Sequence, residues 1–401
     1  MRASKKGLGA KQKPHSYACI FLDLENSFID TQNNPPPLSE GWITVENEVK
    51  NLLKRLTEAS GVSGHEANVG KIVYDELKDH VDSIETDNFG NVISLKKASG
   101  KNGLKIMLAG HMDEIGLIVN HVDEKGFVYF ERIGGVFPRA LFYQPVIIHT
   151  RKGSLSGLTS CKAPDTPEEA NKMPELKAFF IDIGAKSRLE AEKLGVRVGD
   201  TVTFERPFKI LGSGNILASK AFDDRVGVCV VIETMKNLAE NRVDANVYGV
   251  ADVQEEVGCR GAQVAAYKIA PDMAIAVDIT LAGDVPGVAE KDVVTKVGQG
   301  PAIKVMDSAG SLGLISNLKL RELIVSTAEE EKIPYQMEIL PRGSTDAATI
   351  HLTREGVPSC VISIPTRYAH TYELLDLKDV VNAVKLLTAT VQKVRKGFSF
   401  K

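Results

Sequence analysis

The sequence of 401 residues lacks an excess of charge of either sign. Its 49 lysines and arginines nearly balance its 52 aspartates and glutamates, which leaves a formal net charge of −3. General affinity for nucleic acid or an anionic membrane needs a basic excess, so the composition argues against both kinds of partner. Apolar runs of roughly 18 residues, the length that a membrane-spanning helix requires, are also missing. We therefore expect a soluble protein with no nucleic-acid partner and no membrane partner.

Paired cysteines are missing as well. The chain has five cysteines, scattered and without a Cys-x-x-Cys pair, namely Cys19, Cys161, Cys229, Cys259 and Cys360. Isolated thiols of this kind are typical of reduced, mostly buried cysteines in an intracellular protein, not of a disulfide framework. The predicted location is the cytoplasm.

The chain is too long for one small core, and its texture changes along its length. Residues 1–44, with a basic start and a triple proline, predict a flexible extension outside the main fold, an organellar address being the alternative. Residues 45–114 and 207–401 alternate apolar strands with amphipathic helices, which is typical of an α/β domain in two parts. Residues 115–206 contain short, alternating, glycine-punctuated segments that predict a small β-rich domain inserted between them.

Acidic residues and a histidine stand where three apolar strands end. Glu255 and Glu256 follow the run 247–253, His111 and Asp113 follow a second run, and Asp278 closes a third. In open α/β sheets the loops at the carboxyl ends of the strands converge on a ligand, so these side chains are expected to meet. A solvated acidic turn is the alternative for the glutamate pair taken alone.

Two helix starts carry further polar residues. Asp223 and Asp224 open a predicted helix, where an aspartate usually caps the first turn. That role explains Asp224 and leaves Asp223 available as a metal ligand. Ser63 and Glu66 predict a capping box for another helix.

A histidine follows the last apolar strand, since His370 comes shortly after the run 358–364. The residues gathered at the strand and helix ends are thus His111, Asp113, Asp223, Glu255, Glu256, Asp278 and His370. Two histidines and three carboxylates can hold two divalent ions if one carboxylate bridges them. Imidazole and carboxylate without thiolate suit zinc, cobalt or manganese. Two such ions close together activate a shared water, which predicts a hydrolase.

Five segments, in this order, resemble the TET-type (tetrahedral) dinuclear metallo-aminopeptidases, a family that includes glutamyl aminopeptidases. They are residues 110–116 (GHMDEIG), 220–225 (KAFDDR), 254–258 (QEEVG), 276–278 (AVD) and 367–370 (RYAH). The likeness covers nearly everything from Glu46 onward. It implies a mixed-sheet exopeptidase core, discontinuous around an inserted β-rich dimerisation domain.

The resemblance also implies a role for each metal ligand. Asp223 is the implied bridging ligand between two divalent ions per subunit. His111 and Asp278 complete one metal site, and Glu256 and His370 complete the other. No further cofactor is implied.

The same resemblance implies the reaction and the assembly. Glu255 is the implied general base, taking a proton from a water that bridges the two metals, and Asp113 orients His111. The expected reaction is hydrolysis of N-terminal residues from peptides. Family members form homodimers that build a tetrahedral homododecamer.

Two alternatives remain at the level of the sequence. The same two-metal site serves amide deacylases and carboxypeptidase-like hydrolases on related folds, so the ligands alone do not select the aminopeptidase reaction. A catalytically inactive scaffold is the other alternative, and the presence of every ligand type and of the base argues against it. The preferred N-terminal residue depends on loops such as 282–287 and 343–346, where Ser344 stands in place of the family's usual glycine.

Overall fold

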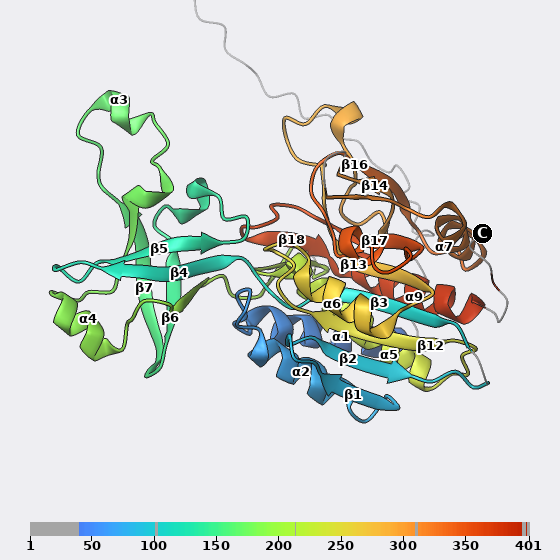
Figure 1. Cartoon of the computed structure of the whole chain (residues 1–401). Helices are drawn as coiled ribbons and strands as arrows, with labels where there is room; N and C mark the ends of the chain where they lie inside the picture. The colour runs from blue at the N-terminus through green and yellow to red at the C-terminus, as the bar shows by residue number, and fades with distance from the viewer. Residues whose placement is uncertain (1–39, 101–102, 213, 309–311, 395–397, 399–401) are drawn as a thin grey trace, which may run out of the picture.

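The computed structural model describes residues 40–100, 103–212, 214–308, 312–394 and 398 (Figure 1). Within these residues a mixed nine-stranded sheet runs in the order β1-β2-β12-β3-β13-β17-β14-β15, with β16 paired to β14. Its strands are β1 (Ser83–Thr86), β2 (Val92–Lys96), β3 (Lys105–His111), β12 (Asn246–Asp252), β13 (Met273–Leu281), β14 (Ala302–Asp307), β15 (Leu314–Ile315), β16 (Gln336–Leu340) and β17 (Ser359–Thr366).

The centre of the sheet is parallel. Strands β12, β3, β13 and β17 pair in the same direction, with Asp252 in register with His111. Both faces of these strands are covered, which explains their nearly continuous apolar sequences. Because they end at the same edge of the sheet, the polar residues at their carboxyl ends meet there.

Helices cover both faces of the sheet. Alternate strand residues pack to opposite sides, so that Leu108 faces one helical layer and Met107 the other. The first layer contains α1 (Glu40–Glu58), α2 (Ala67–Leu77), α5 (Phe222–Ala239), α7 (Leu318–Glu330) and α9 (Leu377–Lys393). The second contains α6 (Arg260–Ile269) and α8 (Ala347–Ile350). The predicted α/β core with a mixed sheet is confirmed.

A closed barrel stands beside the main sheet, as Figure 1 shows. Its order is β4-β5-β8-β7-β6-β9, and its own core contains Leu117, Val128, Val146, Ile181 and Val202. The strands are β4 (Gly116–Val122), β5 (Val128–Ile133), β6 (Pro145–Thr150), β7 (Gly153–Cys161), β8 (Phe179–Asp182) and β9 (Thr201–Phe204). The β-rich insertion expected from the sequence is thus a barrel between β3 and α5.

Short elements complete the described chain. A small sheet has the order β10-β11-β18, formed by Lys209–Leu211, Ile216–Ser219 and Glu373–Asp376. The remaining helices are α3 (Pro167–Ala170), α4 (Arg188–Leu194) and the 3-10 turns η1 (Pro138–Leu141), η2 (Leu176–Ala178) and η3 (Glu290–Asp292). No helix in the described ranges is both long and apolar enough to cross a membrane.

Two features of the amino-terminal part bear on the expectations from sequence. Helix α1 begins at Glu40, inside the expected extension 1–44, whose residues 1–39 lie outside the described chain. The predicted capping box is wrong, because Glu66, not Ser63, stands at the N-cap position of α2 and its side chain makes no cap bond there. The Ser63 hydroxyl instead donates a hydrogen bond to Asp113 Oδ2 at 2.6 Å. A tertiary partner has replaced the local one.

Candidate active site

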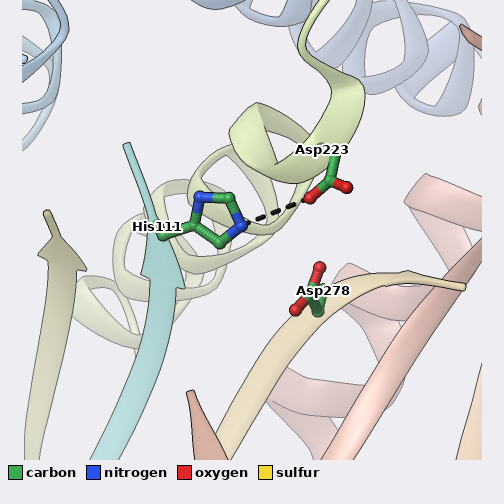
Figure 2. A group of neighbouring side chains, drawn as sticks. All are labelled: His111, Asp223 and Asp278. Carbon is green, nitrogen blue, oxygen red and sulfur yellow. Dashed lines mark ion pairs between the residues drawn. The ribbon is translucent and has the colours of Figure 1, made fainter. Parts of the chain in front are cut away.

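Three of the residues singled out in the sequence converge at the carboxyl edge of the sheet. His111 ends β3, Asp278 lies on β13, and Asp223 stands at the start of α5, all facing a common space (Figure 2). One ligand atom from each lies within 4.8 Å of the others. His111 Nε2 is 3.2 Å from Asp223 Oδ1.

A second group shares Asp223. It contains Glu256, which follows β12, and His370, which follows β17, again with one ligand atom of each residue within 4.8 Å of the others. His370 Nε2 lies 3.2 Å from Asp223 Oδ2 and 3.5 Å from Glu256 Oε1. The two oxygens of Asp223 therefore face two different imidazoles, one in each group.

The outer nitrogen of each imidazole is held by a backbone carbonyl. His111 Nδ1 lies 3.1 Å from the carbonyl oxygen of Asp113, and His370 Nδ1 lies 3.1 Å from that of Gly135. A carbonyl oxygen can only accept, so Nδ1 carries the proton in each ring. In the neutral ring that a metal would bind, the lone pair is then on Nε2, which faces the carboxylates.

The inner atoms have the unmet bonding capacity that a cation would satisfy. His111 Nε2 and Glu256 Oε1 are buried, and neither makes a well-aligned hydrogen bond in the described part of the chain. Buried polar atoms without a partner are uncommon in folded proteins. Together with the imidazole and carboxylate donors, they fit a divalent metal.

The pKa values reflect the crowding of these groups. Burial alone would lower the pKa of both histidines, but the carboxylates of Asp113 and Asp223 raise the pKa of His111 well above its usual value. For His370, Asp223 and Glu256 likewise outweigh burial and raise the pKa to about 10. The pKa of Asp223 is lowered: burial would raise it, and the two imidazoles outweigh burial. The site attracts positive charge.

Burial raises the pKa of two other carboxyl groups in this cluster well above the usual range, those of Asp278 and Glu256, and the neighbouring Asp223 adds to both shifts. A carboxyl that is costly to ionise next to other carboxylates becomes favourable to ionise beside a metal cation. These residues therefore have the electrostatic character of ligands rather than of surface acids.

Glu255 lies beside the imidazole and carboxylate cluster, with its Oε2 3.7 Å from His111 Nε2. Burial raises the pKa of its carboxyl, His111 opposes that shift, and Asp113 and Asp223 add to it. A carboxylate with a raised pKa accepts a proton more readily, which is what a general base requires.

Asp113 makes more bonds to the Glu255-Glu256 backbone than to His111. Its Oδ1 accepts the backbone N–H of Glu255 at 2.9 Å, and its Oδ2 accepts that of Glu256 at 3.1 Å. Its carboxylate is 3.4 Å from His111 Nδ1, farther than its own carbonyl oxygen. The expected orienting of His111 is thus shared between the carbonyl and the carboxylate of Asp113.

Three residues that sequence reasoning missed as site residues support the cluster. Glu373 accepts the backbone N–H groups of His370 at 2.9 Å and of Asp223 at 3.1 Å. Asp224 caps its helix through Gly227 N, as predicted, but its other oxygen also accepts the N–H of His111 at 3.2 Å. The Asp-Asp pair was a visible signal for Asp224, whereas Glu373 gave none.

Gly135, the third missed residue, belongs to the barrel segment between β5 and β6. A Cβ added there would lie 2.5 Å from His370 Nδ1, so only glycine fits without displacing the ring. The neighbouring Gly134 would place its Cβ 3.1 Å from Glu256 Oε2. The insertion therefore contributes backbone directly to the second group.

A cavity of about 430 Å³ opens onto the cluster. Its lining includes five of the residues singled out in the sequence, Asp223, Glu255, Glu256, Asp278 and His370. The other two, His111 and Asp113, are almost fully buried. A ligand in this cavity would reach the proposed base and both groups.

A mixed α/β sheet with imidazoles and carboxylates gathered at its strand ends defines a metal-dependent hydrolase. Residues 90–386 match the family described as M42 glutamyl aminopeptidase. The lysyl aminopeptidase of Pyrococcus furiosus is 39% identical over 350 residues, which cover 86% of this chain and 97% of the relative. The chain belongs to the M42 glutamyl aminopeptidase family and is an aminopeptidase, a hydrolase of peptides.

Solved structures agree with this assignment and with the resemblance to TET-type enzymes. The aminopeptidase APDkam598 from the archaeon Desulfurococcus kamchatkensis has a TM-score of 0.84 and 44% identity, covering 89% of this chain and 100% of that one. The TET1 peptidase of Pyrococcus horikoshii has a TM-score of 0.76 and 30% identity, covering 86% and 100%. The latter can assemble into a tetrahedron or a large octahedral shell. The predicted family is confirmed.

Proposed function

We propose that this aminopeptidase holds two divalent metal ions per subunit, zinc, cobalt or manganese, and uses them to hydrolyse the first peptide bond of unblocked peptides. The observation that carries the proposal is the position of Asp223. Its two carboxylate oxygens each lie 3.2 Å from the Nε2 atom of a different histidine. A carboxylate shared in this way suits a bridging ligand.

The ligand roles follow from the two groups that Asp223 joins. His111 and Asp278 would hold one ion with Asp223, and Glu256 and His370 would hold the other with it. These are the donor types that zinc, cobalt and manganese accept. When bound, the ions would lower the pKa of the attacking water and stabilise the negative charge that develops on the carbonyl oxygen.

The protein's own residues would move the protons. Glu255 takes a proton from the water while the oxygen of that water bonds to the first carbonyl carbon of the peptide. The same carboxyl then gives this proton to the leaving amine nitrogen as the C–N bond breaks. Asp113 acts as a positioning residue, because it holds the backbone of Glu255 and Glu256 through two N–H bonds.

The division of the chain is also a proposal. Residues 1–44 are assigned to an N-terminal extension, 45–114 and 207–401 to the catalytic domain, and 115–206 to a dimerisation domain that contains the barrel. We also propose self-association as a homodimer and as a tetrahedral homododecamer, and the tetrahedron that the Pyrococcus horikoshii relative can form supports assembly into a shell. The proposed setting is peptide degradation in the cytoplasm.

The test is release of amino acids from a panel of free-amine peptides by chelator-stripped protein, with zinc, cobalt or manganese added back. We expect metal-dependent, successive loss of N-terminal residues, with two ions bound per chain at full activity. Cleavage of N-blocked substrates alone would overturn the aminopeptidase mechanism in favour of an amide deacylase. Full activity with one ion per chain would overturn the two-metal assignment.

A further inference from the structure

A buried ion pair lies at the same cavity as the proposed metal ligands. Lys304 on β14 and Glu338 on β16 are register partners in adjacent parallel strands, with Lys304 Nζ 3.2 Å from Glu338 Oε1. Their side chains are 1% and 0% exposed. Burying two charges costs desolvation that their attraction often fails to repay. The proposed proton transfers do not use this pair, so its costly burial calls for another role.

The surroundings connect the pair to the cavity. Lys304 is part of the cavity lining, and the hydroxyl of Thr280, another lining residue, donates to Glu338 Oε1. Thr280 lies two residues beyond Asp278 on β13, so the two side chains point to the same face of the sheet. The cavity thus reaches from the proposed metal ligands to the lysine of the pair.

Much of the remaining lining is apolar, although Ser344 and Thr345 also contribute to it. Besides the proposed ligands, the lining includes Phe137, Ile279, Leu281, Leu312 and Leu340. Arg342 also lines the cavity, but its side chain is exposed, where solvent and salt screen its charge.

We propose that this part of the cavity receives the side chain of the substrate's N-terminal residue and selects a neutral, apolar one. The Lys304–Glu338 pair keeps this part of the cavity neutral, because each charge compensates the other. This inference rests on the proposed aminopeptidase mechanism. A lysine side chain entering the cavity would meet a lysine whose countercharge is taken, and a glutamate would meet a cation that is already paired. In both cases the lost hydration is not recovered.

The experiment compares peptides that differ only in the charge of the first residue. Norleucine against lysine and glutamine against glutamate keep the shape nearly constant, so the ratio of kcat/KM within each pair isolates charge. With metal-loaded parent protein we expect the neutral member to be preferred by about tenfold or more in each pair, on the scale of a charge left without a partner in a low-dielectric site.

Single substitutions should convert this neutrality into opposite charge preferences. Glu338→Gln leaves Lys304 uncompensated and should raise the glutamate-to-glutamine ratio by about tenfold. Lys304→Met leaves Glu338 uncompensated and should raise the lysine-to-norleucine ratio by a similar factor. The double variant K304M/E338Q removes both charges together, so the shifts of the single variants should cancel and the neutral member of each peptide pair should again be preferred. If one single variant does not fold, the shift of the other still tests the proposal, because the absence of a shift in a folded variant overturns it.

A matched control is Glu85→Gln, which removes the partner of Lys268 from an exposed ion pair at 2.7 Å on the far edge of the sheet. It should leave both ratios unchanged. The proposal is overturned if the parent cleaves lysine or glutamate peptides as well as their neutral partners, or if folded single variants do not shift in opposite directions. Failure of the aminopeptidase mechanism itself would look different, because every free-amine peptide would then be inert.

Discussion

The contact between the barrel and His370 gives the most direct test of the site. Gly135 shows no left-handed backbone, so an alanine there is opposed only by space. Its Cβ would lie 2.5 Å from His370 Nδ1, where ordinary contacts begin at 3.4 Å. The imidazole or the loop must therefore move by about 0.9 Å, whereas metal–ligand distances tolerate roughly 0.2 Å.

The expected cost follows from this displacement. The hydrogen bond from His370 Nδ1 to the Gly135 carbonyl would be strained or lost, and the ring would leave the orientation that directs Nε2 toward Asp223. Changes to such supporting partners typically cost 10–100-fold in metal affinity, or about 1.4–2.7 kcal/mol. Gly135→Ala should lower the affinity for the ion proposed at His370 by this factor and leave the affinity for the ion at His111 near that of the parent.

Chelator competition monitored by metal content would measure both affinities without depending on activity. Gly70→Ala is the matched control, because the nearest atom to its added methyl is 3.4 Å away and the residue lies in helix α2. It should bind both ions as the parent does. A Gly135→Ala protein that still holds two ions with parent affinity would refute the proposed dependence of this metal group on the barrel.

Three further predictions concern the base, the ions and a remote carboxyl. Glu255→Gln should lower kcat by about 10²–10⁴-fold with metal content unchanged; a variant retaining a tenth of parent kcat would contradict the assigned base. Stripping the ions should lower the melting temperature in calorimetry, since ligands that bind only the folded state stabilise it, and an unchanged melting temperature would argue against structural metal binding. Burial raises the pKa of Asp379 to about 6, against the hydrogen bonds from Gly298 and Gly300. Because the pKa of Asp379 is higher in the folded state than in the unfolded state, the protonated carboxyl favours folding at low pH. This contribution to the free energy of unfolding is lost as the pH rises through 6. Urea unfolding should show the parent losing about 2 kcal/mol relative to Asp379→Asn between pH 4.5 and 7, and parallel pH curves would contradict this.

The strand-end rule explains why most of the cluster was predictable from sequence. His111, Asp278 and His370 all follow or end apolar parallel strands, and parallel strands ending at one edge bring such residues together whatever the loops do. Their convergence depends on hydrophobic pattern and chain direction, both of which are legible in the sequence. Their roles as ligands remain proposals.

The supporting residues were not predictable for an equally physical reason. Gly135 acts through a backbone carbonyl on a histidine 235 positions away, and no side-chain pattern records such a contact. Ser63 and Glu66 matched a local capping motif, in which the serine oxygen accepts a backbone N–H. In the fold the Ser63 hydroxyl instead donates to the buried carboxylate of Asp113, and helix α2 begins after Glu66. Local motifs fail where a tertiary partner fixes the position of the residue that the motif would use.

The two proposed metal groups also differ in how they are built, and this difference predicts an order of metal loss. His111 is 1% exposed and is oriented by a carbonyl two residues along its own chain, whereas the side chain of His370 is 25% exposed and depends on a carbonyl from the barrel. The first arrangement survives small movements of the insertion, and the second does not. We therefore expect the ion at His370 to exchange first in a chelator time course. Because both ions are needed for the proposed reaction and share Asp223, loss of the ion at His370 should slow catalysis before the ion at His111 is released. Simultaneous loss of both ions would contradict this order.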